Sequence, residues 1–325
     1  MSVQALRSGL LTTLQDAGRP GHAALGIGRA GAADGPAWRL ANALVGNTGG
    51  EAALEITLQG PTLCFERAAR IALTGAPIDA SVGERPLPPW TAVDLPAGSV
   101  LRLRGMRQGC RSYLAVRGGF AVPAVLGSRS VDLHARLGPL GGRALVAGDV
   151  LPLDETGGIE AIDQLRIRRW GVDPQPWFDF ALGPLALLPG SHADRLDAAS
   201  RERLHRQPFR LAASSNRTGA RLEGEALALA APLELVSEAV LPGTVQLPPS
   251  GQPIALLAEA PVTGGYPRIG QVAAVDLPTL AQRRPGDAVQ FVSITLDEAL
   301  ERQNARERDL QRLVQRVLDR GESER

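Results

Sequence analysis

Four short elements recur in the same order in the two halves of the chain. They are residues 58–63, 118–120, 131–133 and 148–150 in the first half, and residues 222–227, 264–266, 275–277 and 286–288 in the second. The gaps between the elements differ between the halves, unlike the fixed period of a solenoid. Strands that persist while loops drift in length are typical of a duplicated domain. The pattern predicts two similar halves with a ligand site in the cleft between them, and chance matching of abundant glycines is the alternative.

Short apolar runs separated by Gly and Pro turns predict strands along most of the chain. In the first half they fall at residues 53–58, 62–65, 69–73, 100–104, 111–116, 144–146 and 150–153. Such strands at turn-punctuated spacing are typical of a barrel or a sandwich.

Three segments predict helices instead. One begins after Asp34, whose carboxylate can cap it, and ends at Gly46. A second covers residues 201–206. A third is predicted in the charged C-terminal tail by an apolar stripe at helical spacing, formed by Leu310, Leu313, Val314, Val317 and Leu318. That stripe docks either onto its own domain or onto a partner.

The resulting prediction is a mainly β fold of two β-barrel halves, with few short helices and a C-terminal helix. The expected domains are residues 1–155 and 185–296, joined by an interdomain crossing at 156–184 and followed by an amphipathic helix at 297–325. Aromatic residues of the crossing, Trp177, Phe178 and Phe180 among them, are expected to pack against a domain.

Composition excludes several kinds of partner. The net charge of +1 gives no drive toward nucleic acid or an anionic membrane, and 4% aromatic residues do not form a stacking platform. No apolar run approaches 18 residues. We therefore expect a cytoplasmic protein that binds neither nucleic acid nor membrane.

All 35 basic residues are arginine, so several cofactors cannot be attached to this chain. Pyridoxal phosphate, biotin, lipoyl groups and a Walker A loop all need a lysine. Any phosphate must be held by arginine forks, backbone N–H groups or helix N-termini. The four histidines and two cysteines lack metal-ligand spacing, so no metal site is expected, and Cys110 is interpreted as a buried structural thiol.

Residues 12–47 are dense in polar side chains and glycines without strand periodicity, which favours close approach of the backbone to a ligand. Arg19 and Arg29 could fork a carboxylate or phosphate. The alternative is that Arg19 forms a local salt bridge with Asp16 and that Asp34 is only a helix cap. We expect Arg19 to be an exposed site arginine.

Further polar segments extend the candidate site. Arg111 and Tyr113 are expected on one face of a strand, because they are two residues apart. Residues 127–132 combine hydroxyls, a guanidinium and a carboxylate in one loop. Residues 214–219 and 263–268 are comparable loops in the second half.

Strings along the chain match a known family. They are Thr12-Thr13-Leu14-Gln15-Asp16, Gly18-Arg19-Pro20-Gly21, Leu40-Ala41-Asn42, Ala53-Leu54-Glu55-Ile56-Thr57, Leu73-Thr74-Gly75-Ala76, Gly109-Cys110-Arg111, Leu126-Gly127-Ser128-Arg129-Ser130 and Thr263-Gly264-Gly265-Tyr266-Pro267. Over about residues 3–296 the chain resembles the 5-oxoprolinase C-subunit family. This family is also known as allophanate hydrolase subunit 2, or as biotin-dependent carboxyltransferase-like proteins.

The resemblance implies two cyclophilin-like β-barrel halves and a heteromeric complex. The partners would be the 5-oxoprolinase B-type subunit together with a lamB/YcsF-like protein, the A-type subunit. With this chain they would hydrolyse 5-oxoproline to glutamate at the expense of ATP. Mg²⁺ is a further candidate cofactor, whereas no biotin is attached to this chain. The expected catalytic residues are Asp16, Arg19, Asp34, Arg129 and Arg217. The expected substrate-binding residues are Gln15, Gly31, Asn42, Glu55, Arg111, Tyr113, Ser128, Asn216, Thr263, Gly264, Gly265 and Tyr266.

Two positions depart from the family pattern. The family commonly has Asp where this chain has Asn216, and a second threonine where it has Val262. If an Asp is needed as a base or charge clamp, Asn216 puts the reaction in doubt. Two other functions therefore stay open: a regulatory protein that sequesters a kinase inhibitor similar to the B-type subunit, and a carboxyltransferase-like component of urea or allophanate metabolism.

Overall fold

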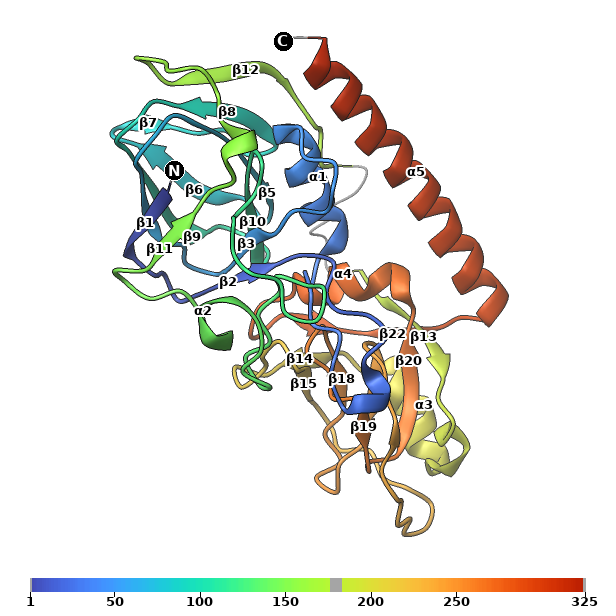
Figure 1. Ribbon diagram of the computed structural model, residues 1–325. Coiled ribbons are helices and arrows are strands. Elements are labelled where there is room, and N and C mark those ends of the chain that lie inside the picture. The colour runs from blue at the N-terminus through green and yellow to red at the C-terminus, as the bar shows by residue number, and fades with distance from the viewer. Residues whose placement is uncertain (1, 176–182, 324–325) are drawn as a thin grey trace. The chain divides into compact units, whose positions relative to one another are not determined.

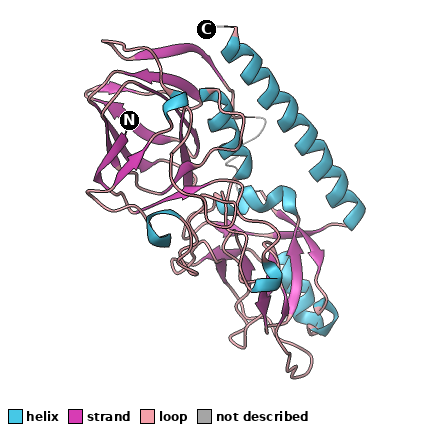
Figure 2. Ribbon diagram, viewed as in Figure 1, coloured by secondary structure: helices cyan, strands magenta, loops and turns pink. Residues whose placement is uncertain are grey.

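The computed structural model describes residues 2–175 and 183–323, so the aromatic residues expected to pack at 177–180 lie outside the described residues. The chain divides into two compact units. The first comprises residues 1–19, 30–179 and 310–325, and the second comprises residues 20–29 and 180–309. Strands and loops dominate both, and Figure 2 shows that helices are few. The predicted mainly β fold with few short helices and a C-terminal helix is confirmed.

The first unit contains two six-stranded sheets (Figure 1). The first sheet has the order β11 (Val150–Pro152), β1 (Ser2–Arg7), β4 (Thr62–Phe65), β9 (Ser99–Met106), β6 (Ile78–Val82) and β7 (Arg85–Pro86). The second sheet has the order β12 (Arg166–Gly171), β8 (Thr91–Leu95), β5 (Ala69–Gly75), β10 (Arg111–Val116), β3 (Ala53–Thr57) and β2 (Leu11–Gln15). All the strand pairs within these two sheets are antiparallel.

A row of leucines crosses the second sheet. Leu14, Leu54, Leu114 and Leu73 lie directly opposite one another on β2, β3, β10 and β5. None is more than 3% exposed. Because side chains alternate along a strand, the residues next to these leucines project from the other face of the sheet. That face carries polar side chains, and helix α1 (Gly35–Val45) packs over it.

Local signals account for the start and end of α1. The side chain of Asp34 accepts a hydrogen bond from the backbone N–H of Ala37 at 3.1 Å, and Pro36 follows in the first turn. Gly46 ends the helix with φ of 83°, a left-handed conformation that favours glycine. The predicted cap and stop are both confirmed. The other helical segments of this unit are α2 (Pro139–Gly142) and the 3₁₀ turn η2 (Glu155–Gly157).

The second unit contains an eight-stranded sheet and a two-stranded sheet. The larger has the order β21 (Ala288–Val289), β14 (Phe209–Leu211), β15 (Gly219–Glu223), β18 (Ile254–Leu256), β17 (Thr244–Gln246), β20 (Arg268–Val272), β13 (Leu185–Pro189) and β22 (Phe291–Ser293). The smaller pairs β16 (Glu238–Ala239) with β19 (Thr263–Gly264). The helical segments are α3 (Ala198–Arg206), α4 (Leu277–Ala281), η1 (Ala23–Leu25), η3 (Ala193–Arg195) and η4 (Ala274–Asp276).

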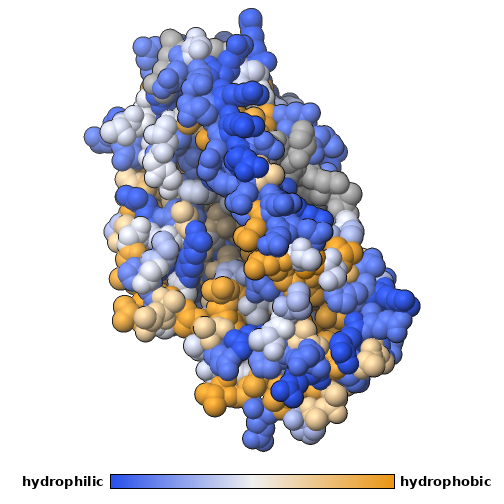
Figure 3. Space-filling view, turned by 90° about the vertical axis from the view of Figure 1, so that its right-hand side faces the viewer, coloured by the Kyte–Doolittle hydropathy of each residue, from blue (hydrophilic) through white to orange (hydrophobic). Residues whose placement is uncertain are grey.

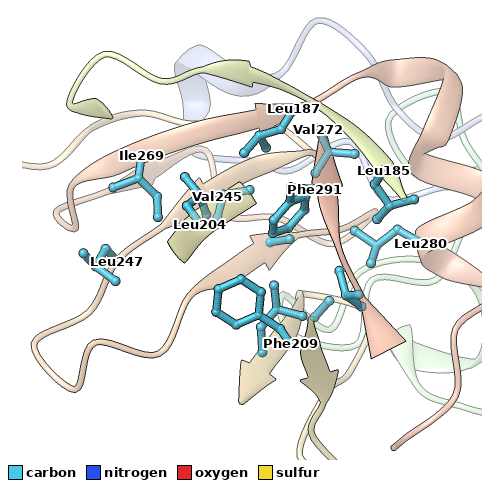
Figure 4. Packing of buried hydrophobic residues seen from close by; sticks show 14 of the residues in the cluster. Leu185, Leu187, Leu204, Phe209, Val245, Leu247, Ile269, Val272, Leu280 and Phe291 are labelled. Atoms are coloured by element: carbon cyan, nitrogen blue, oxygen red, sulfur yellow. The ribbon is translucent and has the colours of Figure 1, made fainter. Parts of the chain in front are cut away.

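Aromatic and branched side chains fill the core of the second unit. The rings of Phe209 and Phe291 lie 6.1 Å apart with an interplanar angle of 52°, a favourable tilted arrangement. Val245 and Leu187 pack in the same cluster (Figure 4). The cluster also includes Leu204 of α3, which fixes that helix against the sheet.

Helix α5 (Leu296–Glu322) is the predicted C-terminal helix. Thr295 and Glu298 begin it with a capping box, in which each side chain accepts a hydrogen bond from the other residue's backbone N–H at 3.3 and 3.0 Å. Leu310 and Val317 of the predicted stripe are buried, which agrees with docking of the stripe within the chain. Most other side chains of α5 are polar, and Figure 3 shows many hydrophilic residues on the side where Figure 1 draws this helix.

The strand predicted at residues 144–146 is wrong: the segment is a loop that turns at Gly148, where the Asp149 carboxylate accepts a hydrogen bond from the N–H of Val146 at 2.8 Å. The repeated glycine pairs also differ in conformation. Gly118 and Gly119 both have positive φ in a turn, whereas Gly264 belongs to the extended strand β19.

Candidate functional site

A row of polar side chains crosses the second sheet on the face covered by α1. Thr13, Glu55, Tyr113 and Thr74 lie directly opposite one another on four adjacent strands. None is more than 2% exposed. Thr74 donates from its hydroxyl to the carbonyl of Ala37 in α1 at 2.7 Å, which ties the helix to the row. Buried polar groups cost free energy unless they are hydrogen-bonded, so such a row needs a network.

Glu55 and Tyr113 are the centre of that network. The phenol of Tyr113 donates to Glu55 Oε2 at 2.7 Å and accepts from the backbone N–H of Asp34 at 2.8 Å. Glu55 also accepts from the N–H of Ala33 at 2.9 Å, and the guanidinium of Arg111 lies 3.6 Å from its other oxygen. Arg111 and Tyr113 therefore share a face, as their spacing predicts.

The surroundings keep Tyr113 protonated. Burial raises the pKa of its phenol well above 10.0, and the carboxylates of Glu55 and Asp34 raise it further. Placing a second negative charge beside buried carboxylates is unfavourable in a low dielectric. Tyr113 is therefore a hydrogen-bond donor to Glu55 at every pH at which an ordinary phenol keeps its proton.

Asp16 organises a second part of the same unit. Its Oδ1 accepts from the hydroxyls of Ser128 and Ser130, both at 2.6 Å, and from the N–H of Gly18 at 2.8 Å. Its Oδ2 accepts from the N–H of Arg129 at 2.6 Å. Four donors saturate much of the hydrogen-bonding capacity of one carboxylate. The arrangement gives Asp16 a positioning role, clamping the loop of residues 126–132 to the end of β2.

Gln15 and Arg19 flank this clamp and each leaves one polar atom without a partner. Gln15 Nε2 donates to the carbonyl of Val131 at 2.9 Å, and Arg19 donates from Nη2 to the carbonyl of Ser130. Gln15 Oε1 and Arg19 Nη1 are buried and have no hydrogen-bond partner among the residues that the structure describes. A buried polar atom without a hydrogen-bond partner lowers stability by about 1–3 kcal/mol. A ligand or a water molecule is therefore expected to bind to each of the two atoms.

Arg19 corrects two expectations. It is 1% exposed, so the prediction of an exposed arginine is wrong. Within residues 2–175 and 183–323 it also makes no salt bridge with Asp16, because the Asp16 oxygens are taken by the serine hydroxyls and backbone N–H groups. Backbone carbonyls solvate the Arg19 guanidinium instead, through Ser130 and through Val125 at 3.5 Å.

Gly31, Asn42 and Arg129 support the surrounding loops. Gly31 has φ of 95°, and a Cβ there would lie 3.0 Å from the backbone nitrogen of Gly18. Asn42 donates to the carbonyl of Glu51 at 3.0 Å. Arg129 is exposed and donates to the carbonyl of Val122 at 2.9 Å. Gly31 and Arg129 thus fix backbone around the clamp, and Asn42 fixes the segment that follows α1.

The second unit has its own buried charged pair. Arg217 Nε lies 2.6 Å from Glu259 Oε1, and both side chains are 2% exposed. Asn216 is exposed beside them, and its Oδ1 accepts from the N–H groups of Thr218 at 2.9 Å and Gly219 at 3.2 Å. An aspartate could accept the same two bonds, so Asn216 preserves this turn.

Residues 263–266 are largely exposed. Thr263 and Gly264 pair with β16, and Tyr266 is 45% exposed. A Cβ at Gly265 would meet nothing closer than 3.5 Å. The segment is therefore accessible on its own unit.

Ser130 belongs to the polar loop that the sequence singled out at residues 127–132, but its bond to Asp16 was not predicted. Sequence reasoning missed Glu259. Glu259 follows the apolar run of residues 253–258 and carries the one acidic side chain there, which is a signal for a buried partner.

Residues 2–175 and 183–323 hold no group of three or more His, Cys, Asp or Glu side chains arranged to bind a metal ion. In the same described ranges, no helix is long and apolar enough to cross a membrane.

The fold and the buried clusters define a mainly β protein whose first unit places a carboxylate clamp beside two unpartnered polar groups. Residues 25–293 match the family model described as carboxyltransferase domain, subdomain A and B, and the chain belongs to this family.

Relatives of known name extend this result over nearly the whole chain. The chain is 41% identical to the C-type subunit of 5-oxoprolinase from Escherichia coli K12, over 97% of this chain and 98% of that protein. It is 36% identical to the C-type subunit of 5-oxoprolinase from Haemophilus influenzae, over 94% and 96%. Among solved structures, the urea amidolyase of K. lactis superposes with a TM-score of 0.87 at 26% identity, over 95% of this chain and 20% of that one.

Proposed function

We propose that this chain is the C-type subunit of an ATP-dependent 5-oxoprolinase, which works with the A-type and B-type subunits to hydrolyse 5-oxoproline to glutamate. Its similarity along nearly the whole chain to two proteins named as this 5-oxoprolinase component supports the proposal. The structural observation that carries it is the pair of buried, unpartnered atoms, Gln15 Oε1 and Arg19 Nη1, beside the Asp16 clamp.

These two atoms are complementary to a lactam acid. The ring of 5-oxoproline offers one N–H donor, a carbonyl oxygen and a carboxylate. Gln15 Oε1 is an acceptor suited to the ring N–H, and Arg19 Nη1 is a cationic donor suited to either oxygen group. Binding of 5-oxoproline would give both atoms hydrogen-bond partners. It would therefore remove the free-energy penalty of leaving two buried polar atoms unpaired.

Ring opening sets a further requirement. A lactam amide is a poor electrophile, and ATP supplies the phosphoryl group that converts its oxygen into a better leaving group. The residues of this chain would orient the ring and stabilise developing negative charge, with Arg19 nearest the clamp and Arg129 on the clamped loop. Tyr113 and Glu55 would hold the α1 end of the site rigid through their hydrogen bonds.

The residues present do not fit a complete nucleotide site on this chain. It has no lysine, and therefore no Walker A loop to hold the β- and γ-phosphates. We therefore place ATP and Mg²⁺ on the partners, which are the B-type protein of the complex and the lamB/YcsF-like A-type protein. The proposal includes a cytoplasmic complex, two cyclophilin-like halves built mainly from residues 1–155 and 185–296, and no attached biotin.

The alternatives have less support. The departure at Asn216 is the argument for a purely sequestering role, but Asn216 makes the two turn hydrogen bonds that an aspartate could also make. A urea- or allophanate-type role has support only from more distant relatives, of which the chain covers about a quarter or less.

The test is reconstitution with the A-type and B-type proteins of one organism, measuring glutamate formed from 5-oxoproline and ATP. The single chain should show no turnover, and the complex should be active. Arg19→Lys keeps a cation but loses the fork that ends in Nη1, and should lower kcat/KM about 100-fold, typical for loss of a charge-stabilising donor. Arg19→Ala is less informative, because removing a buried guanidinium also destabilises the fold.

Arg70→Lys is the matched control. Arg70 is also poorly exposed, at 12%, and pairs with Asp94 at 2.6 Å within the second sheet. Its variant should keep most of the complex's activity. Turnover by the single chain, or equal losses in both variants, would contradict the proposed function.

A further inference from the structure

A polar hollow of about 370 Å³ lies on the first six-stranded sheet, apart from the candidate site on the second sheet. Gly60 forms part of it and donates from its N–H to the carbonyl of Arg104 at 2.9 Å. A Cβ at Gly60 would lie 3.0 Å from Ile78 Cδ1 and closer still to the side chain of Leu103. Glycine therefore allows the chain before β4 to lie close against β9, which shapes the hollow.

Three arginines border this hollow from two strands. Arg7 on β1 lies opposite Thr62 on β4, and Thr62 lies opposite Arg102 on β9. Residues opposite one another in antiparallel strands project from the same face, and Arg104 is on that face because it is two residues from Arg102. All three arginines and Thr62 line the hollow.

These positive charges have no acidic partner. Arg7, Arg102 and Arg104 are exposed, and none forms an ion pair with any residue in the described part of the chain. No carboxylate lines the hollow within that same part. The contrast is Arg143, whose guanidinium binds both oxygens of Asp149 at 2.7 Å. Like charges gathered on one sheet face destabilise it, so the arrangement calls for an external anion.

We propose that this hollow binds the phosphate groups of a small phosphorylated molecule, a site separate from the proposed reaction. Arginine forks match phosphate oxygens bidentately, and the Thr62 hydroxyl can donate a further bond. Arg7 and Arg102 are two strands apart, about 10 Å at the backbone, so a ligand with two linked phosphates can reach both guanidinium groups. In this chain without lysine, arginine is the only side chain that is always positively charged.

The experiment uses the full chain and isothermal titration calorimetry at fixed ionic strength. Pyrophosphate should bind saturably, inorganic phosphate more weakly, and citrate serves as the carboxylate control. Arg102→Gln, Arg104→Gln and Arg7→Gln should each weaken pyrophosphate binding about tenfold, the usual effect of losing one charge-assisted contact. Arg107→Gln is the matched control, because Arg107 follows β9, is 81% exposed, pairs with Asp79 and does not line the hollow.

Each outcome decides the proposal. Saturable pyrophosphate binding that the three variants weaken and Arg107→Gln leaves intact supports it. Binding of citrate as tight as pyrophosphate would overturn the phosphate class, and binding that the three variants leave unchanged would place the site elsewhere. Unaltered circular dichroism spectra of the variants exclude loss of folding as the cause. Activity of the complex is not the readout, so this result is independent of the proposed reaction.

Discussion

Tyr113 gives a sharp test of the buried network, because its phenol both donates to Glu55 and accepts from the N–H of Asp34. Tyr113→Phe removes both bonds in one step. The lost hydrogen bond to a carboxylate is worth about 1.5–3 kcal/mol, and the orphaned N–H adds a further cost of about 1–3 kcal/mol. We expect unfolding free energy to fall by roughly 3 kcal/mol at pH 8.

The effect should depend on pH in a definite direction. The pKa of Tyr113 is raised above 10.0 in the folded state, so its contribution is fully present below pH 10 and is lost as pH rises above it. In the unfolded chain the phenol ionises near its ordinary value while the folded state keeps the proton. One pH unit is worth about 1.4 kcal/mol, so the difference between wild type and Tyr113→Phe should shrink by about 1.4 kcal/mol between pH 8 and pH 11.

Urea unfolding at pH 8, 10 and 11 measures this difference. The absence of lysine makes the alkaline range favourable, because no lysine titrates there. The chain has only two tyrosines, and Tyr266→Phe is the control, since Tyr266 is 45% exposed. A difference between wild type and Tyr113→Phe that stays constant to pH 11 would refute the assignment of Tyr113 as a buried, protonated donor.

Two further perturbations probe the loops and the second unit. Gly119→Ala should destabilise the chain by about 2 kcal/mol or more, because φ at Gly119 is 77° and the new Cβ would lie 2.8 Å from Glu51 Cβ. Gly265→Ala should cost less than about 1 kcal/mol. Thermal unfolding measures both variants, and equal losses of stability would contradict the reasoning. Arg217→Ala removes the side chain that lies 2.6 Å from Glu259 and should lower the free energy of unfolding by about 3–5 kcal/mol. Adding Glu259→Gln should restore part of this stability. If the double variant loses as much stability as the two single variants together, the pair is not coupled.

Local features of the fold could be predicted from the sequence because short-range chemistry determines them. Asp34 and Gly46 bound α1 through a cap and a left-handed stop, and both act within a few residues of their positions. The strand at residues 111–116 also follows from its own composition. The loop at residues 144–146 could not be predicted. Its apolar residues are typical of a strand, whereas the Asp149 side chain stabilises a turn by accepting a hydrogen bond from the N–H of Val146.

The residues that form the site could be predicted from the sequence, but their contacts with one another could not. Asp16, Ser128 and Arg19 are recognisable as polar residues in glycine-rich segments. Asp16 and Ser128 are 112 residues apart, and long-range packing of the loop against β2, including a bond from the N–H of Val131 to the carbonyl of Leu14 at 2.9 Å, brings them together. The burial of Arg19 depends on the same long-range packing, which explains why the sequence suggested an exposed side chain.

The clamp explains why the two unpartnered atoms occur as a pair. Gln15 donates to the carbonyl of Val131 and Arg19 to the carbonyl of Ser130, so consecutive carbonyls orient both side chains. Asp16 holds the same segment through the Ser130 hydroxyl, and the Asp16 backbone N–H donates back to that hydroxyl at 2.9 Å. A displacement of this loop would therefore move both orphan atoms together. The network thus holds an acceptor and a cationic donor at a fixed separation, as the proposed recognition of a lactam N–H and an adjacent oxygen would require.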